Sequence, residues 1–224
     1  MAEAAWKSGT TLLVATPHMQ PSGYPYHPAQ ADLSAKLREL QLALKDRGIP
    51  LRVLLGAEVL FSVDIVRRLH EGRARSMAGG PYVLVELAGH DIPFGFEDRL
   101  YELQLEGYIP ILAHPERHAA FQHDPRLVLP LVERGMLVQI TAGSLLGRFG
   151  KASMMAAETM VTQGIVHVVA SDGHSAEQRP PVLAQARARL EELVGAEAAR
   201  WMVSEAPDWA RAPKGNAPAD PELL

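Results

Sequence analysis

The sequence predicts an α/β fold built on a parallel sheet, either a closed or nearly closed barrel or an open doubly wound sheet. Short apolar runs alternate with helical patterns along the chain, which is the order of strand–helix–strand units. The runs are continuous rather than alternating, as in parallel strands covered on both faces. The length of 224 residues fits one domain, expected at residues 1–206.

Six apolar runs are expected to form the strands of this sheet. They are Thr11–Ala15, Arg52–Leu55, Tyr82–Val85, Ile109–Ala113, Leu137–Ile140 and Val166–Ala170. None is followed by a glycine-rich dinucleotide fingerprint or a P-loop sequence, so a nucleotide cradle is disfavoured.

Helical patterns fill the segments between these strands. The expected helices are Ala29–Arg47, Val63–Glu71, Phe96–Leu105, Pro125–Arg134, Lys151–Gln163, Pro181–Leu193 and a last piece near Glu197–Val203. The first has leucines at three- and four-residue steps, with Gly48 just after its end. Asp124 is placed to cap the helix that begins at Pro125. The proline-rich tail at 207–224 is expected to be loosely ordered.

Composition excludes several functional classes. A net charge of −4 argues against a general nucleic-acid binder, and no apolar run is long enough for a membrane span. The N-terminus lacks the pattern of a signal peptide. Cysteine is absent, which removes disulfides, thiolate nucleophiles and cysteine-based zinc sites. A reducing cytoplasm is the simplest setting.

Acidic residues and histidines follow five of the six expected strands. These residues are His18, Glu58, Glu86, His114, Asp172 and His174. In a parallel barrel the carboxyl ends of the strands meet at one rim, where barrel enzymes keep their chemistry. Three carboxylates packed together repel unless they are neutralised. Mixed with three imidazoles, they favour a divalent metal site, suited to manganese, iron(II) or zinc.

Each of these residues alone has a simpler explanation, as a cap, a hydrogen-bonding group or a solvated loop residue. The joint pattern at one rim favours metal binding or catalysis. Of the remaining histidines, His70 is expected to face solvent and His167 to lie in the core. The others, His27, His90, His118 and His123, are expected in loops and not as ligands.

Arg117 and Arg179 lie in the loops after two of these strands. A guanidinium group is a planar fork suited to bidentate phosphate binding, so the pair indicates a phosphate-bearing substrate. The alternative is structural: Arg117 could pair with Glu116, and Arg179 could anchor its own loop.

Four segments, ATPH, GAE, ILAHPER and ASDGH…RPP, together resemble the polymerase-and-histidinol-phosphatase (PHP) superfamily. The branch most similar is that of the bacterial capsular-polysaccharide protein-tyrosine phosphatases, and the resemblance covers His18 to about Val203. It implies a distorted TIM-like barrel of seven βα units and a cluster of two or three metals, often manganese. The six acids and histidines fall on the family's metal-ligand positions. Arg117 and Arg179 fall on its phosphate-binding, catalytic positions.

The sequence departs from that family in one respect. The family opens with a strand that carries Asp-x-His-x-His, whereas no His-x-His occurs in this sequence. Residues 1–9 resemble the end of the family's first helix, so the first strand and two histidine ligands are expected to be missing. A start upstream of Met1 is favoured over truncation or degeneration. As written, the chain is expected to bind fewer metals or bind them more weakly, and exposed strand edges would favour homo-oligomers.

The expected reaction is metal-assisted hydrolysis of phosphotyrosine on a bacterial tyrosine kinase that controls capsular or exopolysaccharide synthesis. A metal-activated water attacks phosphorus while Arg117 and Arg179 hold the equatorial oxygens. The alternatives are a small-molecule phosphatase of the histidinol-phosphate kind and a catalytically impaired, truncated binding module. A metal-dependent amidohydrolase would need similar ligands, but the two arginines argue against it.

Overall fold

The computed structural model describes residues 1–21 and 30–205. Within this part the strands pair only in parallel, as expected for the α/β class. One sheet has the order β1-β3 and the other β2-β4-β5-β6-β7-β8. The strands are β1 (Leu12–Ala15), β2 (His18–Met19), β3 (Arg52–Leu55), β4 (Glu58–Leu60), β5 (Tyr82–Glu86), β6 (Ile109–Ala113), β7 (Leu137–Thr141) and β8 (Val168–Ala170).

The two sheets form one interrupted ladder. Ala15 pairs with Leu55 and His18 pairs with Glu58, so the register is kept across the break. Backbone hydrogen bonds from Gly56 N to Ala15 O (2.8 Å) and from Glu58 N to Pro17 O (3.1 Å) span the gap. β1 and β2 are therefore two halves of one strand direction, and β3 and β4 are the halves of its neighbour.

This interruption corrects the expected positions of three acidic or histidine residues. His18 and Glu58 were expected in loops after their strands, but they are the first residues of the short strands β2 and β4. Pro17 has no N–H to donate to a ladder, which separates β1 from β2. Glu86 is the last residue of β5 rather than the residue after it.

The helices follow the expected order, with three short additions. They are α1 (Ala2–Lys7), α2 (Gln30–Asp46), α3 (Ile65–His70), α4 (Phe96–Leu105), α5 (Ala119–His123), α6 (Leu129–Glu133), α7 (Ala142–Leu145), α8 (Gly150–Thr162), α9 (Ala184–Val194) and α10 (Ala196–Arg200). The single helix expected at Pro125–Arg134 is a 3₁₀ turn, Pro125–Val128, followed by α6. Asp124 accepts a hydrogen bond from Arg126 N at its start, so the expected cap is confirmed.

Two segments have a different secondary structure from the one predicted, and some predicted features lie outside the described residues. Helix α5, with His123 in it, occupies a segment expected to be a loop. A π-helix, Trp201–Glu205, continues α10. Ala29, His27 and the tail at 207–224 lie outside the described residues. No helix in the described part is long and apolar enough to cross a membrane.

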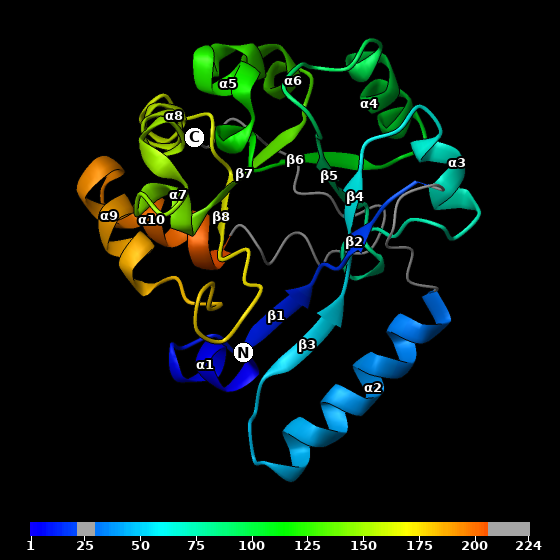
Figure 1. Cartoon of the computed structure of the whole chain (residues 1–224), viewed down its shortest axis with the longest axis vertical. Coiled ribbons are helices and arrows are strands. Elements are labelled where there is room, and N and C mark those ends of the chain that lie inside the picture. The colour runs from blue at the N-terminus through cyan, green and yellow to red at the C-terminus, as the bar shows by residue number, and fades with distance from the viewer. Residues whose placement is uncertain (22–29, 206–224) are drawn as a thin grey trace.

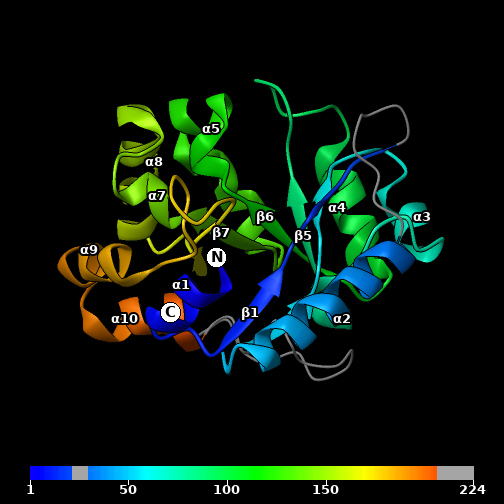
Figure 2. The same ribbon diagram turned by 60° about the horizontal axis from the view of Figure 1, so that its bottom comes forward.

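The core lies on both faces of the strands, as the continuous apolar runs predict. In β5, Val83 and Val85 join the main core cluster, whereas Tyr82 and Leu84 join a second cluster. Helices α3 to α10 surround the curved six-stranded sheet (Figure 1). A third cluster packs α1 and α2 against β1 and β3 (Figure 2). No ladder within residues 1–21 and 30–205 joins β8 to β1 or β2, so barrel closure stays a prediction.

Candidate metal and phosphate site

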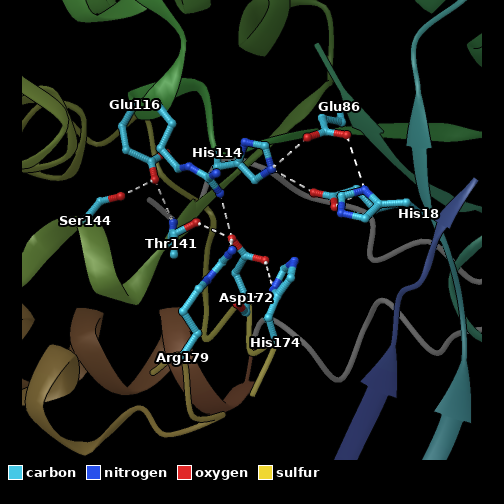
Figure 3. Close-up of polar contacts among 11 residues, drawn as sticks. His18, Glu86, His114, Glu116, Thr141, Ser144, Asp172, His174 and Arg179 are labelled. Atoms are coloured by element: carbon cyan, nitrogen blue, oxygen red, sulfur yellow. Dashed lines mark hydrogen bonds and ion pairs between the residues drawn. The ribbon is translucent and has the colours of Figure 1, made fainter. Parts of the chain in front are cut away.

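Two imidazoles and two carboxylates meet where β2 and β4 begin and where β5 and β6 end (Figure 3). His18 Nδ1 lies 3.1 Å from Glu58 Oε2 and 3.4 Å from Glu86 Oε2. His114 Nε2 lies 2.7 Å from Glu58 Oε1 and 3.7 Å from Glu86 Oε1. These four residues, His18, Glu58, Glu86 and His114, are called the carboxylate–imidazole cluster.

Electrostatics in this cluster favour positive charge. Interaction with the Glu86 carboxylate is the main cause that raises the pKa of His18. Burial opposes protonation of His114, but the hydrogen bond and charge of Glu58 outweigh it and raise its pKa. Both imidazoles therefore respond to an excess of negative potential between the two carboxylates.

The cluster fits a divalent cation. Ligand atoms of His18, Glu58 and Glu86 all lie within 4.8 Å of one another. The donors are carboxylate oxygens and imidazole nitrogens with no sulfur, a set suited to manganese, iron(II) or zinc. A cation would also supply the positive charge that the raised pKa values of the two histidines indicate.

A second group of side chains converges on Asp172, which follows β8 (Figure 3). Arg117 Nη1 and Arg179 Nη2 donate to Asp172 Oδ2 at 2.8 Å and 2.5 Å. Thr141 Oγ1 at the end of β7 donates to the same oxygen at 3.3 Å. His174 Nδ1 lies 3.4 Å from Asp172 Oδ1. The residues Arg117, Asp172, His174 and Arg179 are called the arginine–aspartate cluster.

The two clusters adjoin each other. The rings of His18 and His174 have centroids 5.9 Å apart, and the charge of Asp172 contributes to the raised pKa of His18. All eight residues singled out in the sequence therefore lie in one place. A small cavity of about 140 Å³ opens beside them, lined among others by Glu86, His114, Arg117 and His118.

Two residues of the clusters have strained backbone conformations. His114 and Asp172 have φ values of 36° and 47°, a left-handed region that is unfavourable for residues other than glycine. Such conformations cost about 1–3 kcal/mol each and concentrate at functional sites. The turns after β6 and β8 thus hold a histidine and an aspartate in positions that the surrounding fold must support.

Glu116 is placed differently from the alternative considered above. It does not pair with Arg117; Oε1 accepts hydrogen bonds from Thr141 N (3.0 Å) and Ser144 Oγ (2.7 Å). Burial raises the pKa of this carboxyl. Arg179 does anchor its own loop, because its carbonyl accepts the His174 N–H and its guanidinium binds Asp172.

Phe149 contacts both arginines, a contact that was not predicted from the sequence. The guanidinium carbons of Arg117 and Arg179 lie 4.5 Å and 5.2 Å from the centre of its ring. The phenylalanine directly precedes α8 and is remote in sequence from both arginines. No periodicity or motif in the sequence indicates this contact.

Histidines outside the clusters have other surroundings. His167 is buried and accepts a hydrogen bond from Val138 N (3.1 Å), and burial lowers its pKa to about 4. His70 is exposed beside Glu106 (3.2 Å). His118 lies between the 3₁₀ turn after β6 and α5, so its expected loop position is confirmed, and its side chain is buried. The expected core position of His167 and the solvent-facing position of His70 are confirmed.

Comparisons with known proteins agree on one group of relatives. The family model for capsular polysaccharide synthesis, CpsB/CapC, matches residues 1–209. The tyrosine-protein phosphatase YwqE of Bacillus subtilis (strain 168) is 36% identical over 197 residues, covering 88% of this chain and 77% of YwqE. The putative tyrosine-protein phosphatase CapC of Staphylococcus aureus is 34% identical over 181 residues, covering 81% and 70%.

Solved structures give the same picture. A chain from crystal structures of YwqE from Bacillus subtilis and CpsB from Streptococcus pneumoniae, described as unique metal-dependent tyrosine phosphatases, superposes with a TM-score of 0.85. It is 34% identical, and the match covers 94% of this chain and 83% of that one. The α/β fold with parallel sheets is therefore shared with those structures.

Proposed function

Because the chain belongs to the CpsB/CapC family of capsular polysaccharide synthesis, we propose that it is a metal-dependent protein-tyrosine phosphatase. The observation that carries this proposal is the contact between the two clusters, which puts two arginines beside a carboxylate–imidazole cluster. The relatives named tyrosine-protein phosphatases support the same activity.

The residues that would hold the metals are His18, Glu58, Glu86, His114, Asp172 and His174. Their oxygen and nitrogen donors fit manganese, with iron(II) or zinc as the other candidates. A divalent ion held by these residues would supply Lewis-acid chemistry, which would offset charge on the phosphate oxygens and make hydroxide available near neutral pH.

The arginines bind the phosphate. Both guanidinium groups are directed to one point at Asp172, and each side chain is 29% exposed. Their remaining N–H groups can donate to the equatorial oxygens as charge spreads over them. The phenolate of tyrosine leaves readily, because the pKa of its conjugate acid is only about 10.

The substrate we propose is phosphotyrosine on a bacterial tyrosine kinase that regulates capsular or exopolysaccharide synthesis, in the cytoplasm. We also propose that the fold is the distorted PHP-type barrel and that the metal is manganese. The parallel sheet order and the donor set support these two statements.

The experiment compares hydrolysis of a phosphotyrosyl peptide, a phosphoseryl peptide and histidinol phosphate by the chelated protein before and after manganese is restored. We expect manganese-dependent release of phosphate from the phosphotyrosyl peptide, and a loss of at least 100-fold in Glu58→Gln and Asp172→Asn, because removing one electrostatic group typically costs that much. Glu106→Gln, a change at an exposed carboxylate, is the matched control.

Wild-type rates in both site variants would contradict the assignment of these residues. Faster hydrolysis of histidinol phosphate than of the phosphotyrosyl peptide would contradict the proposed substrate class.

A further inference from the structure

Phe149 contacts both phosphate-site arginines. The guanidinium carbons of Arg117 and Arg179 lie 4.5 Å and 5.2 Å from its ring centre, within the range of cation–π attraction. Arg117 comes from the 3₁₀ turn after β6 and Arg179 from the loop after β8. One aromatic ring thus connects two cations that reach the site from separate segments.

The arginine pair needs such a support. Both guanidinium groups donate to the same oxygen, Asp172 Oδ2, so two positive charges lie against a single carboxylate. Two guanidinium groups that share one acceptor oxygen repel each other, and one carboxylate neutralises only one of the two positive charges. The negative face of an aromatic ring offsets part of the remaining repulsion.

The position of the ring is specified independently of the arginines. Phe149 precedes α8, and its ring lies against Gly143 in α7. A Cβ at position 143 would lie 2.9 Å from Cε2 of Phe149, which is too close for a normal contact. The glycine therefore makes the room that the ring occupies.

We propose that Phe149 is a positioning residue of the phosphate site, and this inference rests on the proposed function. Its ring holds the guanidinium groups of Arg117 and Arg179 side by side so that they bind phosphate together. Asp172 alone is a poor support, since the same carboxylate would have to bind a metal ion and hold the two arginines. An aromatic ring holds the arginines without competing for a metal.

The first test measures phosphate binding without turnover. Calorimetry with inorganic phosphate on the manganese-loaded protein should give a dissociation constant roughly tenfold higher for Phe149→Leu than for wild type. Phe149→Tyr keeps the ring face and should stay within about twofold. Manganese affinity should be unchanged in both, and Phe94→Leu, at a fully exposed phenylalanine, should change nothing.

The second test observes the arginines directly in the metal-free protein. The ring current of Phe149 should displace the side-chain Nε–H signals of both arginines, which Arg117→Lys and Arg179→Lys assign. The displacement should disappear in Phe149→Leu and persist in Phe149→Tyr. Gly143→Ala, which moves the ring rather than removing it, should alter the same signals and serves if Phe149→Leu fails to fold.

Equal arginine signals, or equal phosphate affinity, in wild type and Phe149→Leu would overturn the inference, since the ring would then only fill space. A protein that hydrolyses no phosphotyrosyl peptide but binds phosphate in a ring-dependent way would overturn the proposed function and leave this inference standing.

Discussion

Arg68 offers a sharp test of how the fold places His18 and Glu58. Its side chain is fully buried in α3 and donates to Met19 O at 2.6 Å, Leu60 O at 2.9 Å and Ser62 Oγ at 3.1 Å. Met19 and Leu60 end the short strands β2 and β4, which begin with His18 and Glu58. One guanidinium group therefore binds both strands that carry the two proposed metal ligands.

The change is Arg68→Met, which keeps much of the side-chain volume and removes the donors. Two buried carbonyls then lose their partners, at about 1–3 kcal/mol each. Removing a buried charge returns part of that loss, because burial lowers the pKa of Arg68 by disfavouring its charged form. We expect the free energy of unfolding to fall by about 2–4 kcal/mol and manganese to bind more weakly.

The assay is urea unfolding of the chelated protein at pH 7, followed by calorimetry with manganese. Arg67→Met is the matched control, because the Arg67 side chain is 65% exposed and pairs only with Asp64 among the described residues. It should cost less than about 1 kcal/mol. If Arg68→Met matched the stability and manganese affinity of Arg67→Met, the reasoning that this guanidinium positions β2 and β4 would be refuted.

Three further predictions concern His167, Glu116 and the metals. Burial lowers the pKa of His167 to about 4, so the unfolded chain binds more protons than the folded one between about pH 6.5 and pH 4, and the free energy of unfolding should decrease by up to about 3 kcal/mol from this group as the pH is lowered through that window. His167→Asn, which keeps an acceptor for Val138 N, should flatten that part of a urea-unfolding pH profile, and an unaltered slope would contradict the prediction. Glu116→Gln should change the free energy of unfolding by less than about 1 kcal/mol, because the amide oxygen still accepts from Thr141 N and Ser144 Oγ. Glu116→Ala removes the acceptor and should cost about 2–4 kcal/mol in the same assay, and similar losses in both variants would contradict this prediction. Manganese added to the metal-free protein at 100 times its dissociation constant should raise the free energy of unfolding by about 2.7 kcal/mol. In thermal unfolding this stabilisation should be smaller in Glu58→Gln but not in Glu106→Gln, and equal stabilisation of all three proteins would exclude Glu58 as a ligand.

The parallel sheet was predictable because its strands are buried on both faces and so appear as unbroken apolar runs. The gathering of His114, Asp172 and Glu86 followed from the same pattern, since parallel strands end at one edge of a sheet. The short strands β2 and β4 were missed because two or three residues carry no periodicity. Their pairing depends on a register inherited from β1 and β3.

Contacts that cross the molecule left no local signal. Arg67 and Arg68 are adjacent in a basic stretch of α3, yet one is exposed and the other fully buried, which depends on what packs against the helix. The sequence neighbours Glu116 and Arg117 diverge because the 3₁₀ turn directs one to Thr141 and the other to Asp172. The contact of Phe149 with two arginines depends on the packing of α7 and α8, which no local pattern in the sequence encodes.

The matched breaks in the two neighbouring strands limit how this protein can be re-engineered. Thr16 and Pro17 separate β1 from β2, and Gly56 and Ala57 separate β3 from β4, so both spacers have the same length. A one-residue insertion in either spacer alone would turn the following side chain to the opposite face and part His18 from Glu58. Loop grafts or chimaeras with relatives must therefore exchange both spacers as a unit.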